Sequence, residues 1–201
     1  MELIVKNIKN MRWVFAFTIL CTLVITGCKK EDGFKDVGIS EIYIPQAAIP
    51  GVGNYYTVPS LSAKGKDTYN FKVDNGKLNV FLSVARGGKI SNASGFSVNV
   101  VVSSDDTNAA VAAGKPNAWA LPSDIYAIPG KATVEAGKTD ASFFLSIDIN
   151  ALTDGTYSGQ KLFLALRINN PIPDTYAISG KNNLVIVVID VDAMKPFLIS
   201  Q

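Results

Sequence analysis

The chain has 201 residues, of which 48% are hydrophobic and 18% charged, and this composition fits a one-domain globular protein and excludes a disordered chain. It contains no histidine, which excludes a Ser-His-Asp triad and every histidine-ligated metal site. The chain has 19 basic and 17 acidic residues, and three of the basic residues and one of the acidic residues precede Cys28. The rest of the chain therefore carries 16 of each and lacks the basic excess that nucleic-acid binding requires.

The first 27 residues have the pattern of a secretory signal peptide. Lys6, Lys9 and Arg12 form a positively charged region, and an apolar run of about 14 residues follows from Trp13 to Thr26. A membrane-spanning helix needs about 20 apolar residues, so this run is too short to be one. We therefore expect residues 1–27 to be removed on export.

The end of this run, VITGC at 24–28, resembles the lipobox of bacterial lipoproteins, in which Cys28 becomes the acylated first residue. Several acyl chains, at about 0.8 kcal/mol per buried CH₂, would make a durable membrane anchor. The alternative is an ordinary signal peptide with a chance cysteine. Residues 28–40 are expected to be a flexible tether. Their segment KKEDG at 29–33 resembles the acidic signal that directs Bacteroidetes lipoproteins to the outer face of the outer membrane, although a solvated linker would look the same.

From residue 41 to residue 201 the sequence predicts a single all-β domain. Apolar and polar residues alternate in the ranges 78–85, 96–103, 143–149 and 162–168, which is typical of strands with one buried face. The continuously apolar range 184–189 predicts a strand covered on both faces. Only residues 105–113 look helical. With glycine-bearing turns between the runs, this pattern predicts an antiparallel β-sandwich with one short helix.

No segment of the chain makes a persuasive active site or cofactor site. Gly137-Lys138-Thr139 resembles the end of a phosphate-binding loop, but the required first glycine is absent, and a hairpin turn is the better interpretation. Asp190 and Asp192 lack the rest of a calcium loop. The adjacent pair at 105–106 is better explained by a helix N-cap. We therefore predict no enzyme activity, no metal and no cofactor, although composition alone leaves open a hydrolase with two separated carboxylates.

Aromatic residues near turns are the remaining candidates for ligand binding, because their faces stack on sugars while their polar ends stay hydrated. Tyr55 and Tyr56 border a turn, as do several others. The residues that we select as candidate ligand-binding side chains are Trp119, Tyr126, Tyr157 and Tyr176. The alternative for Trp119, the only tryptophan after Cys28, is that it fills the edge of the core.

The exported part resembles the Bacteroidetes lipoprotein domain of unknown function 1735. The segments that carry the resemblance span nearly all of it: IYIPQA at 42–47, LPSDIY at 121–126, ATVEAGK at 132–138 with the strand 141–149, residues 161–169, and Tyr176 before the final strand. The resemblance implies an immunoglobulin-like sandwich on the cell surface, beside systems that import or degrade glycans. Many such proteins carry their activity in a second domain, and we expect no such fusion in this chain.

These observations lead to one main functional hypothesis and two alternatives. The main hypothesis is a non-catalytic lipoprotein, anchored in the outer membrane and facing the cell exterior, that binds glycan or assists an outer-membrane glycan-import complex. The first alternative is a structural or adhesive module that binds another surface protein. The second is a hydrolase with paired carboxylates.

Overall fold

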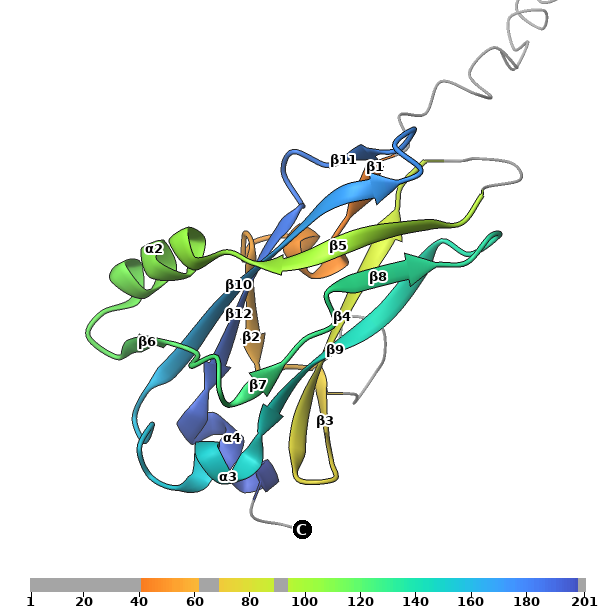
Figure 1. The fold of residues 1–201 in the computed structure, drawn as a ribbon. Helices are drawn as coiled ribbons and strands as arrows, with labels where there is room; N and C mark the ends of the chain where they lie inside the picture. Colours follow the sequence, from red (N-terminus) through yellow and green to blue (C-terminus); the bar gives the residue numbers. More distant parts are fainter. Residues whose placement is uncertain (1–40, 62–68, 89–93, 199–201) are drawn as a thin grey trace, which may run out of the picture. The chain divides into compact units, whose positions relative to one another are not determined.

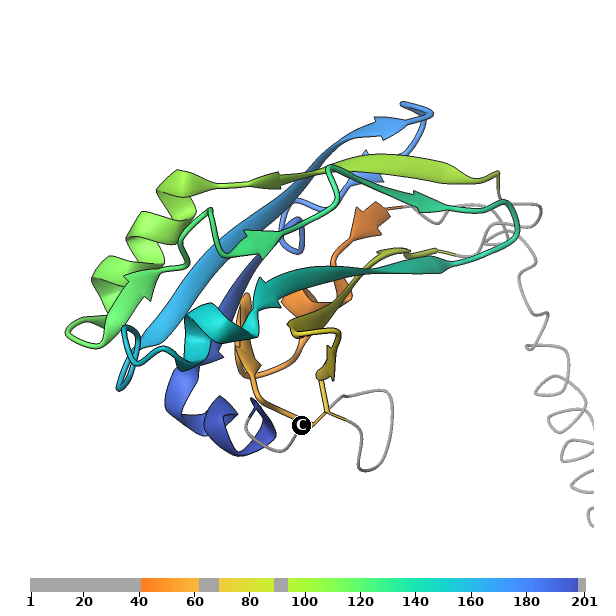
Figure 2. The same cartoon turned by 60° about the horizontal axis from the view of Figure 1, so that its bottom comes forward.

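The computed structural model describes residues 41–61, 69–88 and 94–198. The predicted signal peptide, the acylation site at Cys28 and the tether all lie outside the described residues. Two β-sheets pack face to face, and helices lie at one end and on one outer face (Figures 1 and 2). The predicted all-β sandwich is confirmed.

Each sheet has six strands. The first sheet has the order β11 (Ala177–Ile178), β1 (Glu41–Tyr43), β4 (Lys77–Arg86), β9 (Asp140–Asp148) and β7 (Tyr126–Ala127), with β3 (Phe71–Asp74) also paired to β4. The second has the order β2 (Tyr55–Val58), β12 (Leu184–Asp190), β10 (Lys161–Ile172), β5 (Phe96–Val102) and β8 (Lys131–Val134), with β6 (Ala118–Ala120) also paired to β10. Most pairs are antiparallel as predicted, but β1–β11, β2–β12 and β6–β10 are parallel.

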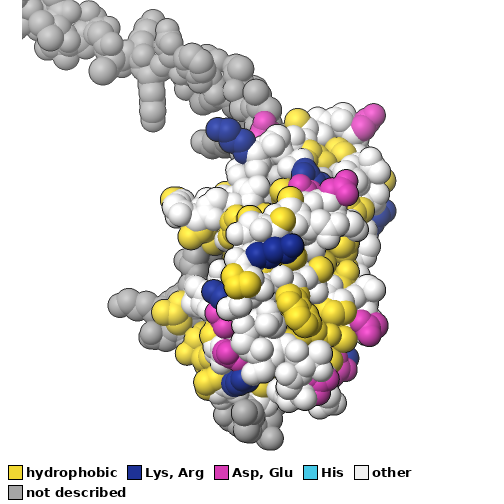
Figure 3. Space-filling model, turned by 90° about the vertical axis from the view of Figure 1, so that its left-hand side faces the viewer, with side chains coloured by type: hydrophobic (Ala, Val, Ile, Leu, Met, Phe, Trp, Pro, Cys, Tyr) yellow, Lys and Arg dark blue, Asp and Glu magenta, His cyan; other side chains and the backbone are white. Residues whose placement is uncertain are grey.

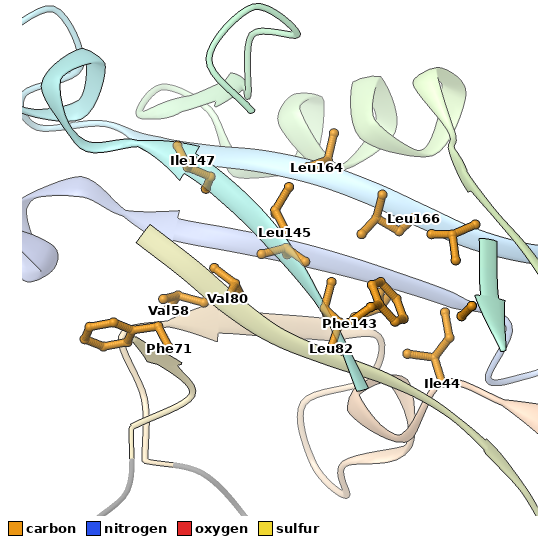
Figure 4. Close-up of a cluster of buried hydrophobic side chains, with 14 of the residues drawn as sticks. Ile44, Val58, Phe71, Val80, Leu82, Phe143, Leu145, Ile147, Leu164 and Leu166 are labelled. Atoms are coloured by element: carbon orange, nitrogen blue, oxygen red, sulfur yellow. The ribbon is translucent and has the colours of Figure 1, made fainter. Parts of the chain in front are cut away.

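The alternating residues form the core between the two sheets. Leu82 of β4, Leu145 of β9 and Leu166 of β10 are at most 1% exposed, and Figure 4 shows them among side chains from both sheets. Val102 is the exception: the pattern predicts it inside, but it is 39% exposed because it is the last residue of β5. Apart from such strand ends, period-two alternation identified the buried face correctly.

A second, smaller hydrophobic cluster explains why β12 is apolar throughout. The helix α2 (Ser104–Gly114), predicted from the sequence, lies on the outer face of the second sheet (Figure 2). Its Ala110 packs with outward-facing side chains of the sheet, which are Phe163, Ala165, Ile186 and Val188. Since Val185, Val187 and Ile189 face the main core, β12 is buried on both faces, as predicted.

Two further helices, α3 (Ile149–Thr153) and α4 (Val191–Leu198), were not predicted and lie together at one end of the sandwich (Figure 1). Each begins where an aspartate ends a strand. Asp148 accepts a hydrogen bond from the backbone N–H of Asn150 at 2.9 Å, and Asp190 accepts one from Ala193 at 3.1 Å. The two aspartates therefore cap helices. Ile149, which we expected in a strand, belongs to α3. No helix within the described part of the chain combines the length and apolar character needed to cross a bilayer.

The predicted turns differ in what they connect. Asn75 and Gly76, with φ of 51° and 70°, join β3 to β4 in a tight hairpin. The turn at Gly137, with φ of 79°, is not the predicted hairpin, because β8 pairs with β5 in one sheet and β9 pairs with β4 in the other. Here the chain crosses between the sheets, an arrangement that local turn chemistry does not distinguish from a hairpin.

Replacing Leu145 with alanine should test the core. Because this side chain is fully buried in the middle of β9, Leu145→Ala should lower the free energy of unfolding by about 2–5 kcal/mol, measured by urea denaturation. The control is Ser142→Ala on the exposed face of the same strand, which should change it by less than about 0.5 kcal/mol. Equal effects of the two substitutions would contradict the assignment of the buried face.

Candidate functional site

The structure brings two of the four predicted ligand-binding residues together. Trp119 of β6 is 46% exposed, and its ring lies perpendicular to that of Tyr157, with 6.2 Å between the ring centroids. Tyr157 is half-buried and packs against the main core. These two aromatic side chains form a small edge-to-face pair at the surface.

The other two predicted residues lie elsewhere. Tyr126 of β7 is half-buried against the core, and this burial raises the pKa of its hydroxyl. Tyr176 is only 7% exposed. Its hydroxyl donates to the backbone carbonyl of Ser94 at 3.0 Å and accepts a hydrogen bond from the buried Arg86 at 3.1 Å. Tyr176 is therefore part of the packed interior and does not belong to an exposed aromatic surface.

A concave surface lies beside the edge strand β2. We call it the tyrosine groove. It has a volume of about 590 Å³, within the usual range for small-molecule sites. Its lining residues are uncharged: Pro45, Gln46, Ile49, Val52, Tyr55, Tyr56, Thr57, Ser60, Leu61, Tyr69, Phe81, Leu82, Ser83 and Ser142.

The groove collects most of the exposed large apolar side chains of the described chain. Seven such side chains are exposed, and four of them, Val52, Tyr55, Leu61 and Tyr69, line this groove. Contiguous exposed apolar surface usually marks a binding site, whereas scattered single residues do not. This concentration distinguishes the groove from the Trp119–Tyr157 pair.

The floor of the groove is built where β4 lacks a neighbouring strand. Along one edge of β4, β3 pairs only as far as Val80 and β1 begins at Ala85. The helical turn η2 (Pro45–Ala48) fills the gap, because the Gln46 side-chain oxygen accepts a hydrogen bond from the backbone N–H of Ser83 at 3.2 Å. A carboxamide thus replaces a strand carbonyl and lies in the groove.

Asn70 holds the side of the tyrosine groove that is formed by the end of β2 and the residues after it. It is 1% exposed, its side chain donates to the carbonyl of Thr57 and accepts from the N–H of Ser60, both at 2.8 Å, and its own carbonyl accepts from the N–H of Phe81 at 3.0 Å. Burial raises the pKa of Tyr56, and a side-chain hydrogen bond with Asn70 offsets part of that rise. The phenol of Tyr56 is therefore neutral at physiological pH.

A second concave surface, which we call the helix groove, adjoins the first. It has a volume of about 530 Å³ and is lined by Tyr55, Thr57, Ala110, Ala113, Gly114, Pro116, Asn117, Lys161, Phe163 and Val188. Tyr55 and Thr57 line both grooves. Among the described residues that line the two grooves, only Lys161 is charged, and its ammonium lies 3.4 Å from the carboxylate of Asp190.

The distribution of charged side chains and of metal-ligating side chains limits what the two grooves can bind. Figure 3 shows basic and acidic side chains scattered over the face in view, with no concentration of either sign. Among the described residues, no group of three acidic, histidine or cysteine side chains could hold a metal ion. The grooves therefore offer stacking surfaces, hydroxyls and amides, which suit binding of an uncharged polar molecule.

The wall of the helix groove depends on how α2 is held. Asp106 in its first turn forms a two-pronged ion pair with Arg167 of β10, with N–O distances of 2.6 and 2.9 Å. The hydroxyl of Thr107 accepts a hydrogen bond from the backbone N–H of Ala165 at 3.0 Å. The N-cap is Ser103, which also bonds to Asp106, so the expectation that an aspartate is the N-cap was wrong.

Acid should weaken this attachment. The hydrogen bond from Arg167, followed by that from Ser103, holds the pKa of Asp106 below its ordinary value. A carboxyl whose pKa is lowered by folding stabilises the protein above the pKa of the unfolded chain, and this contribution disappears as pH falls through the folded-state pKa. Asp106→Asn should therefore lower the urea midpoint at neutral pH, and the deficit should shrink progressively as pH falls below about 4.

The neighbouring Asp105, exposed in the same helical turn, provides the control. The urea midpoint of Asp105→Asn should keep more of the wild-type dependence on pH than the urea midpoint of Asp106→Asn does. A deficit of Asp106→Asn that stays the same from neutral to acid pH would show that the ion pair does not hold α2.

Sequence reasoning missed most of the residues that form the grooves. Gln46 lies in the segment that carries the family resemblance, but its role depends on a gap in a distant strand. Tyr69 and Asn70 lie outside the segments in which apolar and polar residues alternate, so the sequence pattern does not mark them. Tyr55 and Tyr56 border a turn in the sequence, and only the folded structure shows that they line a groove.

Comparison with known proteins gives one family match. A family model described as an N-terminal domain matches residues 40–173, more than half of the chain. No curated protein matches.

Several solved structures are similar at low identity. A multidomain protein from Bacteroides ovatus that includes the domain of unknown function 1735 is 16% identical, with a TM-score of 0.43, and the alignment covers 68% of this chain and 39% of that one. An auxiliary nutrient-binding protein from Bacteroides thetaiotaomicron is 17% identical, with a TM-score of 0.46 and coverages of 68% and 43%. EndoBT-3987 of the same species, solved with a Man5GlcNAc product, is 12% identical, with a TM-score of 0.49 and coverages of 74% and 30%.

The chain therefore spans less than half the length of each of these structures. These likenesses are too distant to transfer a ligand or an activity to this chain.

Proposed function

The chain belongs to the family of the domain of unknown function 1735, and from that premise we propose that it is a non-catalytic lipoprotein of the outer membrane that binds glycan at the cell surface. In this role it captures glycan itself or serves as an accessory subunit of a glycan-import complex. The proposal joins the predicted anchor at Cys28 to a binding surface on the sandwich.

The tyrosine groove is the observation that carries the proposal. Tyrosine rings present flat apolar faces that suit the C–H faces of sugar rings, while their hydroxyls stay hydrated. The exposed fractions are 38% for Tyr55 and 42% for Tyr69, so both rings are accessible. Gln46, Ser60 and Ser142 add amide and hydroxyl groups to the same lining, which suit the hydroxyls of a sugar.

The uncharged side chains in the described lining of the tyrosine groove favour an uncharged ligand and a binding role. A glycosidase of the usual kind needs two carboxyl groups on either side of the scissile bond. No acidic side chain appears in the described lining of either groove. The same exposed apolar surface would also suit another surface protein, so an adhesive module is the second candidate function.

Replacing Tyr55 with alanine should weaken glycan binding. Titration calorimetry of the full chain in detergent against neutral plant and host polysaccharides should detect binding, and Tyr55→Ala should weaken it by about tenfold or more, as for a central aromatic contact. The control is Trp119→Ala, an exposed aromatic outside the groove, which should bind normally. If no polysaccharide binds and a solubilised outer-membrane protein is retained instead, the adhesive function replaces the proposed one.

Acylation at Cys28 can be tested with the second cysteine as a control. In a bacterium that processes lipoproteins, the chain should incorporate an alkyne analogue of palmitate and enter the detergent phase on phase partitioning. Cys28→Ser should abolish both. Cys21→Ser should change neither, because that residue lies in the removed signal peptide. A wild-type chain that stays unlabelled would refute the anchor.

A further inference from the structure

We propose that the tyrosine groove and the helix groove form one elongated site for a linear, uncharged oligosaccharide, with Tyr55 at its middle. The inference rests on the proposed glycan-binding function and adds the length and form of the ligand. A site of this kind would bind chain segments more tightly than single sugars or disaccharides.

The geometry of β2 is the first argument. Tyr55 and Thr57 lie two residues apart on this edge strand, so their side chains point to the same side, and both line both grooves. Their partners in β12 are Ile186 and Val188, and Val188 also lines the helix groove. The two grooves therefore meet along β2, and the exposed ring of Tyr55 lies at the junction.

The size of each groove is the second argument. Volumes of about 590 and 530 Å³ each suit a small molecule, so one groove accommodates a short saccharide and a ligand that fills both is an oligomer. Neither lining favours a charged chain. The described lining of the tyrosine groove has no charged residue, and the ammonium of Lys161 in the helix groove lies 3.4 Å from the carboxylate of Asp190.

Hydrogen bonds and an ion pair hold the elements that line the two grooves. Asn70 fixes β2 to β4 on one side, and the Asp106–Arg167 ion pair fixes α2 to β10 on the other. At the end of α2, a Cβ atom on Gly114 would lie 2.8 Å from the Cβ of Ala118 and 3.1 Å from Phe163. Only glycine lets the helix end approach this closely, which sets the depth of the helix groove.

The experiment measures affinity against ligand length. The full chain in detergent is titrated calorimetrically with malto-, manno- and xylo-oligosaccharides from disaccharide to octasaccharide, together with their parent polysaccharides. For the series that binds, the dissociation constant should fall by about tenfold or more with length before levelling off, with one long oligosaccharide bound per chain.

Two substitutions by arginine separate the halves of the site. Ala113→Arg should obstruct the helix groove, so that long oligosaccharides bind only as tightly as short ones. Val52→Arg should obstruct the tyrosine groove and weaken binding at every length. Asn108→Arg, on an exposed face of α2 outside both linings, is the matched control and should behave like the wild type. Thermal unfolding checks that all three variants are folded.

The outcomes distinguish this inference from the function on which it rests. Binding that does not depend on length, or a length dependence that survives Ala113→Arg in a folded protein, overturns the elongated site and leaves glycan binding in place. No binding of any oligosaccharide or polysaccharide overturns both.

Discussion

The structure depends on satisfying the backbone of two long strands, β4 and β10, whose neighbours on one side are interrupted. Buried backbone groups must find hydrogen-bond partners, and in both strands a side chain supplies what a missing strand would have given. Gln46 accepts from Ser83 between β3 and β1, and Thr107 accepts from Ala165 between β5 and β6. The two helical segments that provide these side chains, η2 and α2, also line the two grooves.

The grooves are thus a consequence of the interrupted sheets. A continuous strand beside β4 would leave no place for η2, and a continuous strand beside β10 would displace α2. The helical segments stand out from the sheets, while β2 is an edge strand that exposes Tyr55. Exposed apolar residues on an edge strand invite association with other chains unless they are used or protected. Their concentration in one concave surface is consistent with use in recognition.

The sequence was informative wherever the determining forces were local or periodic. Alternation placed Leu82, Leu145 and Leu166 inside, and a continuously apolar run identified the doubly buried β12. Features that depend on distant pairing could not be predicted. The Gly137 turn has hairpin chemistry but connects different sheets, and the role of Gln46 requires knowing that β4 has a gap at Ser83. Of the four aromatic candidates, the structure pairs Trp119 with Tyr157 and buries Tyr176 in the core.

The position of β12 has a consequence for the order of events during biogenesis. It is the last strand described, yet it pairs with β2 from the beginning of the domain and with β10, and it supplies side chains to both hydrophobic clusters. Contacts between such distant parts of a chain form late and slowly. The tyrosine groove and the helix groove, which β2 and Val188 help to line, therefore cannot be complete until β12 is available to pair with β2.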